Sequence, residues 1–426
     1  MDLVYMESVG HAYRNFILFT HTSIFYFNSS YAAPETQIPR PIPQKSTLSS
    51  NNIMPDNTAA WLTSNKATPL VVKSAPYISP KANEILIKNH AVAINPVDWI
   101  IQRDGTSFMY QWLKFPAVLG YDCAGEVVEV GPSVTRFKVG DRVVGMAAGA
   151  SEKINDPSQG AFQTYTILLV HMASPIPAAL SYEEACVIPL GASTAACGLF
   201  EKDQLALQLP SSSAKPTGKT LLIWGGSTSV GINAIQLAVA AGYEVITTAS
   251  PRNFELVKKL GASQVFDYNS ATVIRDVVEA FKDKTIAGAL SMGQGAAEAC
   301  SKILASCKGN KFIAMVTYPT PNKPPTSLVA VRTAVFFMSW MATNAVKSKV
   351  RGISYKFVFG DLLVDSGVGK AVYQDFLPGA LADGSFVAAP APEVVGTGLE
   401  FIQEAFELQK KGVSAKKLVV RLAVDE

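Results

Sequence analysis

The fold of this chain is decided by the stretch Thr220-Leu-Leu-Ile-Trp-Gly-Gly-Ser-Thr-Ser-Val-Gly231. Its first five residues form a short apolar run that is typical of a buried strand, and a helix is predicted over Ile232–Ala241. The loop between them fits the pattern G-x-G-x-x-G, with Gly226 and Gly231 at the outer positions and Thr228 in place of the middle glycine. Backbone N–H groups at a helix start attract phosphate, so this loop predicts a dinucleotide-binding site.

The sequence after this loop alternates predicted strands with predicted helices. The strands are expected at Tyr243–Thr248, Gln264–Tyr268, Ile286–Leu290 and Lys311–Val316, and the helices at Phe254–Leu260, Ala271–Phe281 and Ala296–Ser306. This alternation predicts an α/β fold, a doubly wound parallel sheet with helices on both faces. Ligands bind such a sheet at the carboxyl ends of its strands.

The sequence before the loop predicts a small β-rich domain. Strand regions are expected at Glu84–Ile94, Val118–Gly131 and Val139–Gly145, and Asn95-Pro96 is a turn signal between the first two. Several short strands punctuated by glycines favour a barrel-like domain.

The first 56 residues differ from the rest. The segment from Asn28 to Pro55 is rich in Pro, Ser, Thr and Asn, which favours disorder. We interpret residues 1–56 as a disordered extension, or as an over-long start whose natural initiator is Met54. The alternative is a targeting signal, with Phe16–Phe27 as its apolar core.

The composition excludes several classes of protein. The 426 residues carry 37 basic and 34 acidic side chains, so the net charge of +3 provides no strong field for nucleic acid. Five cysteines in so long a chain are not the disulfide framework of a small secreted domain. The charged share of only 17% suits a globular, cytoplasmic enzyme with an apolar pocket.

The nucleotide type is predicted from the end of the second strand of the sheet. NAD-binding sheets place an acidic residue there for the ribose 2′-hydroxyl. This chain has Thr248-Ala-Ser-Pro-Arg-Asn253, which contains no acid. Ser250 and Arg252 can hold a 2′-phosphate instead, since a guanidinium group matches phosphate geometry. We therefore predict NADPH rather than NADH, with Tyr268 flanking the adenine end.

Several motifs in order resemble the medium-chain dehydrogenase/reductase superfamily. They are Gly120-Tyr-Asp-Cys-Ala-Gly125, Val139-Gly-Asp-Arg-Val143 and Gly225–Gly231. Further matches resemble a fungal branch of zinc-binding alcohol dehydrogenase domain-containing proteins (CipB-like), which is similar to trans-acting enoyl reductases and to quinone oxidoreductases. These matches are Ile94-Asn-Pro-Val-Asp-Trp99, Leu222–Gly231 and Gly412-Val-Ser-Ala-Lys-Lys417.

The resemblance implies two domains that are interleaved in sequence. A GroES-like catalytic domain would occupy residues 57–195, a Rossmann domain 196–345, and a return to the catalytic domain 346–426.

The resemblance also implies site residues. The nicotinamide side would be flanked by Pro96, Val97, Asp98 and Trp99. The pyrophosphate would be held by Gly226, Ser227, Thr228, Ser229, Val230 and Gly231, and the adenosine end by Ser250, Pro251, Arg252, Asn253 and Tyr268. Val316, Thr317, Ser414 and Ala415 complete the cofactor set. Substrate would contact Ile188, Pro189, Leu190, Gly191, Ala192, Ser193, Thr194 and Ala195.

The resemblance to zinc enzymes fails at the ligand positions. Zinc-dependent members carry Cys, His and Cys where this chain has Asn95, Tyr121 and Leu190. Zinc needs three or four nitrogen or sulfur ligands, so we predict no metal. Related enoyl reductases often carry a Lys where Ile100 stands. Asn95, Tyr121 and Thr194 are then the candidates for polarising the substrate.

Together with the missing zinc ligands, the resemblance implies a zinc-independent oxidoreductase that transfers a hydride from NADPH to an activated C=C bond, in fungal secondary metabolism. The substrate would be small, apolar or thioester-linked, with a polyketide synthase as a possible partner. The alternatives are a quinone oxidoreductase and a non-catalytic NADPH-binding protein. The apolar run Leu328–Val346 is interrupted by Arg332 and Asn344, and the arginine argues against a membrane span. The run favours a substrate wall or a subunit contact over plain core packing, and we expect a monomer or a homodimer.

Overall fold

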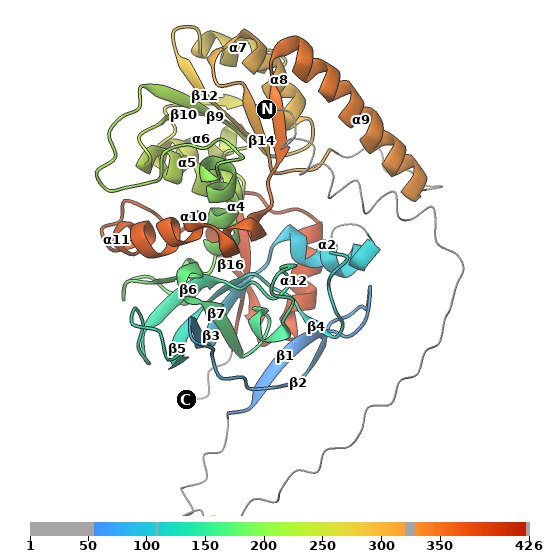
Figure 1. Cartoon of the computed structure of the whole chain (residues 1–426), viewed down its shortest axis with the longest axis vertical. Helices are drawn as coiled ribbons and strands as arrows, with labels where there is room; N and C mark the ends of the chain where they lie inside the picture. Colours follow the sequence, from blue (N-terminus) through green and yellow to red (C-terminus); the bar gives the residue numbers. More distant parts are fainter. Residues whose placement is uncertain (1–54, 108–109, 320–328, 423–426) are drawn as a thin grey trace, which may run out of the picture. The chain divides into compact units, whose positions relative to one another are not determined.

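The computed structural model describes residues 55–107, 110–319 and 329–422 (Figure 1). The predicted N-terminal extension therefore lies outside the described residues up to residue 54, and so does Leu328 of the apolar run. Among the described helices, none combines the length and the apolarity that a bilayer span requires.

The second half of the chain forms a sheet in which every neighbouring pair of strands is parallel. The strand order is β11-β10-β9-β12-β14-β15, and β13 pairs with β12. This order confirms the predicted doubly wound sheet. From β9 the chain adds β10 and β11 on one side, and it then crosses back to add β12, β14 and β15 on the other side of β9. The strands are β9 (Lys219–Trp224), β10 (Glu244–Ala249), β11 (Gln264–Asp267), β12 (Thr285–Ser291), β13 (Lys308–Gly309), β14 (Phe312–Met315) and β15 (Ser354–Phe357).

Both faces of this sheet are covered, and the side chains of β9 are buried on both of them. Leu221 and Ile223 join one hydrophobic core, whereas Leu222 and Trp224 join a second core on the opposite face. A strand that is buried on both sides needs a continuous apolar run, which explains the run before the glycine-rich loop. The helices of this half are α5 (Ser229–Ala240), α6 (Phe254–Lys259), α7 (Val273–Ala280), α8 (Ala296–Ser306) and α9 (Val329–Arg351).

The parallel sheet continues past residue 345, where we expected it to end. Strand β15 pairs with β14 in parallel, with Phe312 opposite Ser354 and Met315 opposite Phe357. The sequence carries little sign of this strand, because Ser354-Tyr-Lys-Phe357 has polar residues at alternate positions and follows the long helix α9. The return to the first domain therefore begins after β15.

The first half forms the expected β-rich domain in two sheets, ordered β2-β1-β4 and β16-β17-β3-β5-β6-β8, with β7 paired to β3. The predicted return of the C-terminal segment is visible in β17, which pairs antiparallel with β3. The strands are β1 (Asn57–Leu62), β2 (Val71–Ala75), β3 (Glu84–Ala93), β4 (Ala117–Val118), β5 (Asp122–Val130), β6 (Arg142–Met146), β7 (Tyr165–Leu169), β8 (Ala173–Pro175), β16 (Ala391–Thr397) and β17 (Lys416–Arg421).

Helix α4 (Pro189–Phe200) connects the two domains, and it contacts both β6 and α5. Its approach to α5 is close, since a Cβ atom on Gly191 would lie 2.7 Å from Ser229 Oγ. The hydroxyl group of Tyr373 donates to the carbonyl oxygen of Pro189 at 2.8 Å. The remaining helices are α2 (Pro96–Asp104), α3 (Tyr182–Ala185), α10 (Gly367–Lys370), α11 (Leu377–Ala382) and α12 (Phe401–Lys410).

Candidate active site

The glycine-rich loop is hydrogen-bonded to the neighbouring strand β10. The backbone N–H of Gly225 donates to Thr248 Oγ1 at 3.0 Å, and that of Gly226 donates to the Thr248 carbonyl oxygen at 2.8 Å. Gly225 has a φ of +93°, and a Cβ atom on Gly226 would lie 2.1 Å from Thr247 Oγ1. Both positions therefore require glycine, one for its backbone conformation and the other for the close approach.

The residue that replaces the middle glycine caps the following helix. Thr228 is the N-cap of α5, and its Oγ1 accepts the Gly231 N–H at 3.0 Å. A Cβ atom on Gly231 would lie 2.3 Å from the Gly225 carbonyl oxygen, so this glycine lets the helix start touch the loop. Ser229 Oγ is buried there without a hydrogen-bond partner. A glycine loop at the N-terminus of a full-length helix, with a spare hydroxyl group, fits a dinucleotide pyrophosphate.

The predicted 2′-phosphate residues lie together at the ends of two paired strands. Ser250 follows β10 and Tyr268 follows β11, and their side-chain oxygens are 3.2 Å apart. Arg252 is exposed beside them. Buried Asn253 donates from Nδ2 toward Ser414 Oγ at 3.5 Å, the outer limit of hydrogen bonding. The tertiary structure thus brings Ser414, from the C-terminal segment, next to Asn253 of the predicted adenosine site.

The predicted cofactor residues that follow β14, Val316 and Thr317, precede a group of aromatic side chains. Val316 donates from its backbone N–H to the Ser291 carbonyl oxygen at 2.9 Å, and Thr317 Oγ1 accepts the Gly293 N–H at 2.9 Å. Next to them, Tyr318 stacks on Phe357 with a 3.5 Å separation between ring centroids. Sequence reasoning missed this group, which combines one residue of α9, one of β15 and two from the connections that follow β14 and β15; its members are Tyr318, Phe337, Phe357 and Phe359.

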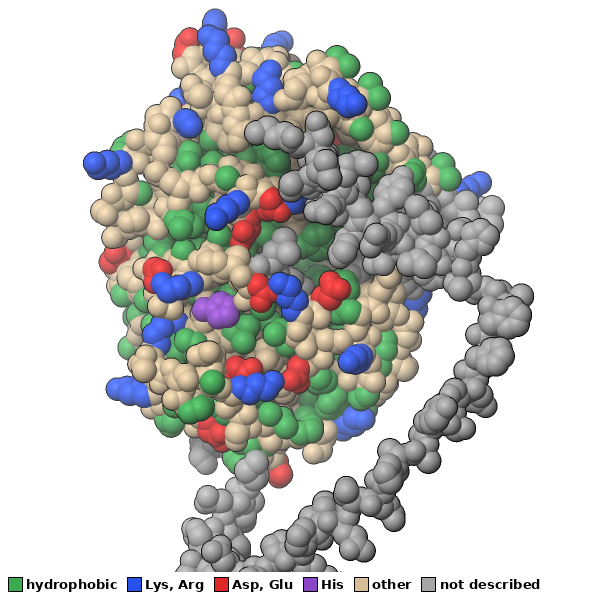
Figure 2. Space-filling model, viewed as in Figure 1, with side chains coloured by type: hydrophobic (Ala, Val, Ile, Leu, Met, Phe, Trp, Pro, Cys, Tyr) green, Lys and Arg blue, Asp and Glu red, His purple; other side chains and the backbone are tan. Residues whose placement is uncertain are grey.

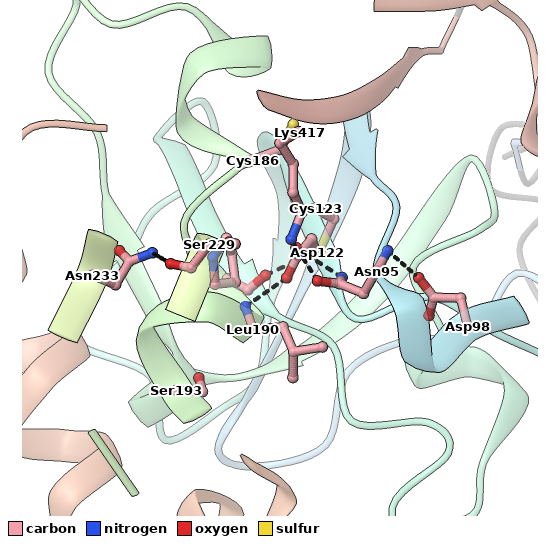
Figure 3. A network of polar contacts seen from close by, with 12 residues as sticks. Asn95, Asp98, Asp122, Cys123, Cys186, Leu190, Ser193, Ser229, Asn233 and Lys417 are labelled. Atoms are coloured by element: carbon pink, nitrogen blue, oxygen red, sulfur yellow. Dashed lines mark hydrogen bonds and ion pairs between the residues drawn. The ribbon is translucent and has the colours of Figure 1, made fainter. Parts of the chain in front are cut away.

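The predicted nicotinamide side is built on a network of buried polar groups (Figure 3). Asp122 Oδ2 accepts from Asn95 Nδ2 at 2.9 Å and pairs with Lys417 Nζ at 2.8 Å. Its other oxygen, Oδ1, accepts the Leu190 N–H at 2.6 Å. Lys417 Nζ also donates to Asn95 Oδ1, and Asp98 Oδ2 accepts the Asn95 N–H at 2.7 Å. The network joins β5, β17, α4 and the start of α2.

Burial dominates the electrostatics of this network. It raises the pKa of the Asp98 carboxyl group to about 8, and the nearby charge of Asp122 acts in the same direction. The N–H of Asn95 and the charge of Lys417 oppose that rise. Asp98 Oδ1 is buried without a partner, which fits a carboxyl group that keeps its proton.

Sequence reasoning missed Asp122 and Lys417. The available signal was weak: Asp122 is the first residue of β5 and Lys417 the second of β17, each directly before apolar residues, but both strands also carry other charged residues. Their burial together follows only from the strand pairing, because a charged residue is buried only with a partner.

The three candidate polarising residues differ in what they contact. Both polar atoms of the Asn95 side chain are used within the network. The Tyr121 hydroxyl group donates to the Tyr110 hydroxyl group at 3.2 Å. Thr194 Oγ1 lies beside Gly360, where a Cβ atom would approach it to 2.8 Å.

The other predicted contacts vary in exposure. Pro96 is exposed and Val97 half-buried, whereas Trp99 Nε1 donates to Gln409 Oε1 of α12 at 2.8 Å. In the predicted substrate segment, Leu190 alone is partly exposed. The others are buried where α4 starts, and they are Ile188, Pro189, Gly191, Ala192, Ser193, Thr194 and Ala195.

The positions of the expected zinc ligands hold an amide, a phenol and an aliphatic side chain, namely Asn95, Tyr121 and Leu190. Cys123 and Cys186 are buried nearby, and this burial raises the pKa of each thiol. Over residues 55–107, 110–319 and 329–422, no group of three or more His, Cys, Asp or Glu side chains is arranged to hold a metal ion.

Two family models match the chain. The model of the alcohol dehydrogenase GroES-like domain matches residues 81–178, and that of the zinc-binding dehydrogenase matches residues 229–347. A structure of an alcohol dehydrogenase superfamily protein from Novosphingobium aromaticivorans has a similar fold, with a TM-score of 0.66 and 23% identity, covering 86% of this chain and 100% of that one.

Curated relatives match at higher identity. Dehydrogenase pigH of Monascus ruber is 58% identical over 87% of this chain and 100% of its own length. The zinc-binding alcohol dehydrogenase domain-containing protein cipB of Emericella nidulans is 46% identical over 86% of this chain and 98% of its own. Trans-enoyl reductase himH of Aspergillus japonicus is 37% identical over 87% and 98%. With its GroES-like domain and its Rossmann sheet, the chain belongs to the medium-chain dehydrogenase/reductase superfamily of oxidoreductases, in the branch that contains these fungal dehydrogenases and enoyl reductases.

Proposed function

We propose that this protein is a zinc-independent, NADPH-dependent reductase of an activated C=C bond in fungal secondary metabolism. The observation that carries the proposal has two parts. A glycine-rich loop joins β9 of the parallel sheet to the start of α5, and the three positions that hold zinc ligands in zinc-dependent members are occupied by Asn95, Tyr121 and Leu190. Alcohol oxidation in zinc enzymes depends on a Lewis acid. Reduction of a polarised C=C bond needs a hydride, a proton and a polar contact for the developing enolate.

The cofactor would lie along the carboxyl edge of the parallel sheet. Gly226–Gly231 would hold its pyrophosphate, and Ser250, Arg252 and Tyr268 its 2′-phosphate and adenosine. Arg252 is the group that favours NADPH, because a guanidinium group gives a phosphate charge-assisted hydrogen bonds. When bound, NADPH supplies a hydride to the β-carbon of the substrate, and a proton is added to the α-carbon.

The chain's own residues would orient the substrate and supply that proton. Asn95 acts as a positioning residue, because its amide group is committed to Asp122 and Lys417. Thr194 is then the first candidate for contacting the substrate carbonyl. Tyr121 is the second, because its hydroxyl group donates to Tyr110 at 3.2 Å and would have to exchange that contact for the substrate. The matched variants Tyr121→Phe and Thr194→Val each remove one hydroxyl group and keep the shape of the side chain.

The substrate class is inferred from aromatic side chains near Thr194. Phe359 precedes Gly360, whose Cβ atom would lie 2.8 Å from Thr194 Oγ1, and its ring belongs to one group with those of Tyr318 and Phe357. Such rings suit an apolar acyl chain rather than a small polar alcohol. We propose an unsaturated acyl group, free or held as a thioester by a polyketide synthase, as the substrate. The name of the relative himH, a trans-enoyl reductase, supports this choice.

The proposal is tested by NADPH oxidation with an enone, an enoyl pantetheine thioester and a quinone, and by NADP⁺ reduction with an alcohol. We expect turnover of the thioester and the enone, with unchanged rates after dialysis against a chelator. Turnover of the quinone alone would make the protein a quinone oxidoreductase. NADPH binding without turnover of any member would indicate a non-catalytic protein, and loss of activity on chelation would overturn zinc independence.

A further inference from the structure

The two faces of helix α9 have different surroundings. On the inner face, Trp340 Nε1 donates to Glu298 Oε1 of α8 at 2.6 Å, and Asn344 is buried. Phe337 lies on the same side, with its ring 6.3 Å from that of Tyr318. These contacts fix the rotation of the helix, so the residues opposite them face solvent.

The outer face carries an apolar stripe, which we define as Val335, Met338, Ala342, Val346 and Val350. Their spacings of three and four residues place them on one side of a helix. Val335 is 60% exposed, Val346 64% and Val350 79%. Figure 2 shows hydrophobic side chains gathered along the outer edge of α9. An exposed apolar patch of this kind marks an interaction site more often than a scatter of single residues does.

The charged residues of α9 have a single sign, since the helix contains four basic residues and no acidic one. Arg332 and Lys349 border the stripe, whereas Lys347 and Arg351 follow Trp340 and Asn344 by seven residues and so lie toward the inner face. A second copy of this chain would place basic groups against basic groups, whether the two helices ran parallel or antiparallel. Like charges brought together at an interface cost several kcal/mol. The charge pattern therefore favours an acidic partner.

The size of the stripe points to a transient contact. From Val335 to Val350 the helix rises about 22 Å, and with a width of about 10 Å the stripe covers about 200 Å². A stable interface buries about 800 Å² on each partner. A small patch flanked by cations suits repeated docking and release, in which attraction between opposite charges raises the association rate.

We propose that the outer face of α9 docks a partner protein through an acidic, amphipathic helix, and that this partner carries the thioester-linked substrate. The second part of this inference rests on the proposed function, since it is the thioester substrate that needs a carrier. The first part rests on the stripe and on the charges of α9 alone.

Binding is tested on the full-length protein with NADPH present. The probe is an amphipathic peptide of about 18 residues with leucines on one face and glutamates on the other, and its lysine twin is the counter-probe. We expect the acidic peptide alone to bind, and Met338→Glu and Val346→Glu each to weaken it roughly tenfold or more, a loss typical of a disrupted central contact. Val139→Glu is the matched control, because Val139 is 61% exposed in the β5–β6 connection and should bind as the wild type does.

The carrier role is tested by comparing an enoyl thioester on an acyl-carrier domain with the same acyl group on free pantetheine. The stripe variants should lose rate with the carrier-bound substrate and keep it with the free one. Equal binding of both peptides, or unchanged binding by the stripe variants, would overturn the docking surface. Tighter binding to phosphatidylserine vesicles than to the peptide would assign the stripe to a membrane, and a dimer dispersed by Val346→Glu would assign it to a second copy. If the wild type turned over neither thioester while the peptide results held, the proposed function would fail and the docking surface would stand.

Discussion

Lys417 Nζ lies 2.8 Å from Asp122 Oδ2, and the two side chains are only 5% and 0% exposed. The residues are far apart in sequence, one in the last strand and one in β5, and both strands pair with β3. The C-terminal segment thus supplies a buried cation to the part of the first domain where the resemblance places the reaction. Hydrogen bonds from Leu190 and Asn95 complete the coordination of the Asp122 carboxylate.

Removing this cation should leave a buried carboxylate without its partner. We expect Lys417→Met to lower the free energy of unfolding by about 3–5 kcal/mol, the range for breaking a buried pair from one side. In the double variant Lys417→Met/Asp122→Asn, the new amide can still accept from Leu190 and can donate to a flipped Asn95. The double variant should therefore lose less than the sum of the two single changes in urea unfolding. Strict additivity would show that the two residues do not interact.

The glycine-rich loop should tolerate no added methyl group. In Gly231→Ala the Cβ atom would meet the Gly225 carbonyl oxygen at 2.3 Å, and the helix start would have to move away from the loop. We expect a loss of about 1–3 kcal/mol in stability and a weaker affinity for NADPH, measured by urea unfolding and fluorescence titration. Gly379→Ala is the control, since nothing lies within 4 Å of its Cβ atom and it should behave like the wild type. Unchanged NADPH affinity in Gly231→Ala would separate this loop from the cofactor.

Arg252 should discriminate between the two nicotinamide cofactors. A charge-assisted hydrogen bond contributes about 1.5–3 kcal/mol, so Arg252→Gln should raise the KM for NADPH roughly 10- to 100-fold. The KM for NADH should change little, because NADH has no 2′-phosphate. Arg275→Gln, an exposed arginine on α7, should leave both constants unchanged. An equal rise for both cofactors would show that Arg252 does not contact the phosphate.

Asp98 should make stability depend on pH. Burial raises its pKa from 3.8 to about 8, so between these values the folded protein keeps a proton that the unfolded chain releases. The free energy of unfolding should fall as the pH rises through this window, by at most about 1.4 kcal/mol per pH unit from this group. Asp98→Asn removes the titration, so its stability relative to the wild type should increase from pH 5 to pH 8 in urea unfolding. Asp104→Asn, at the end of the same helix with a side chain that is 45% exposed, is the control. If the free energies of unfolding of the wild type and Asp98→Asn differed by the same amount at pH 5 and at pH 8, the buried proton would be contradicted.

Much of the nucleotide half could be predicted because its signals are local. The apolar run of β9, the glycines after it and the alternating segments downstream are short-range patterns, and α8 begins and ends at the residues expected from the sequence. Strand β15 has polar residues at alternate positions, Ser354 and Lys356, and lies at the edge of the sheet, so it carries no apolar run to extend the predicted sheet beyond residue 345.

The contacts of the candidate site could be predicted only in part. Ser250 and Tyr268 could be expected to meet, because each follows one of two neighbouring parallel strands. The group of Tyr318, Phe357 and Phe359 could not, since it depends on how α9 returns the chain to the sheet.

The sequence by itself determined the cofactor-binding turn, the two domain types and the residues at the three zinc-ligand positions. Each of these depends on residue identity and on short spacings, which the chain carries regardless of how it folds. The tertiary structure decided which charges are buried together, as in Asp122 and Lys417, and which face of α9 meets solvent. Those outcomes depend on strand pairing and on packing across hundreds of residues, because only the folded chain defines what is removed from water.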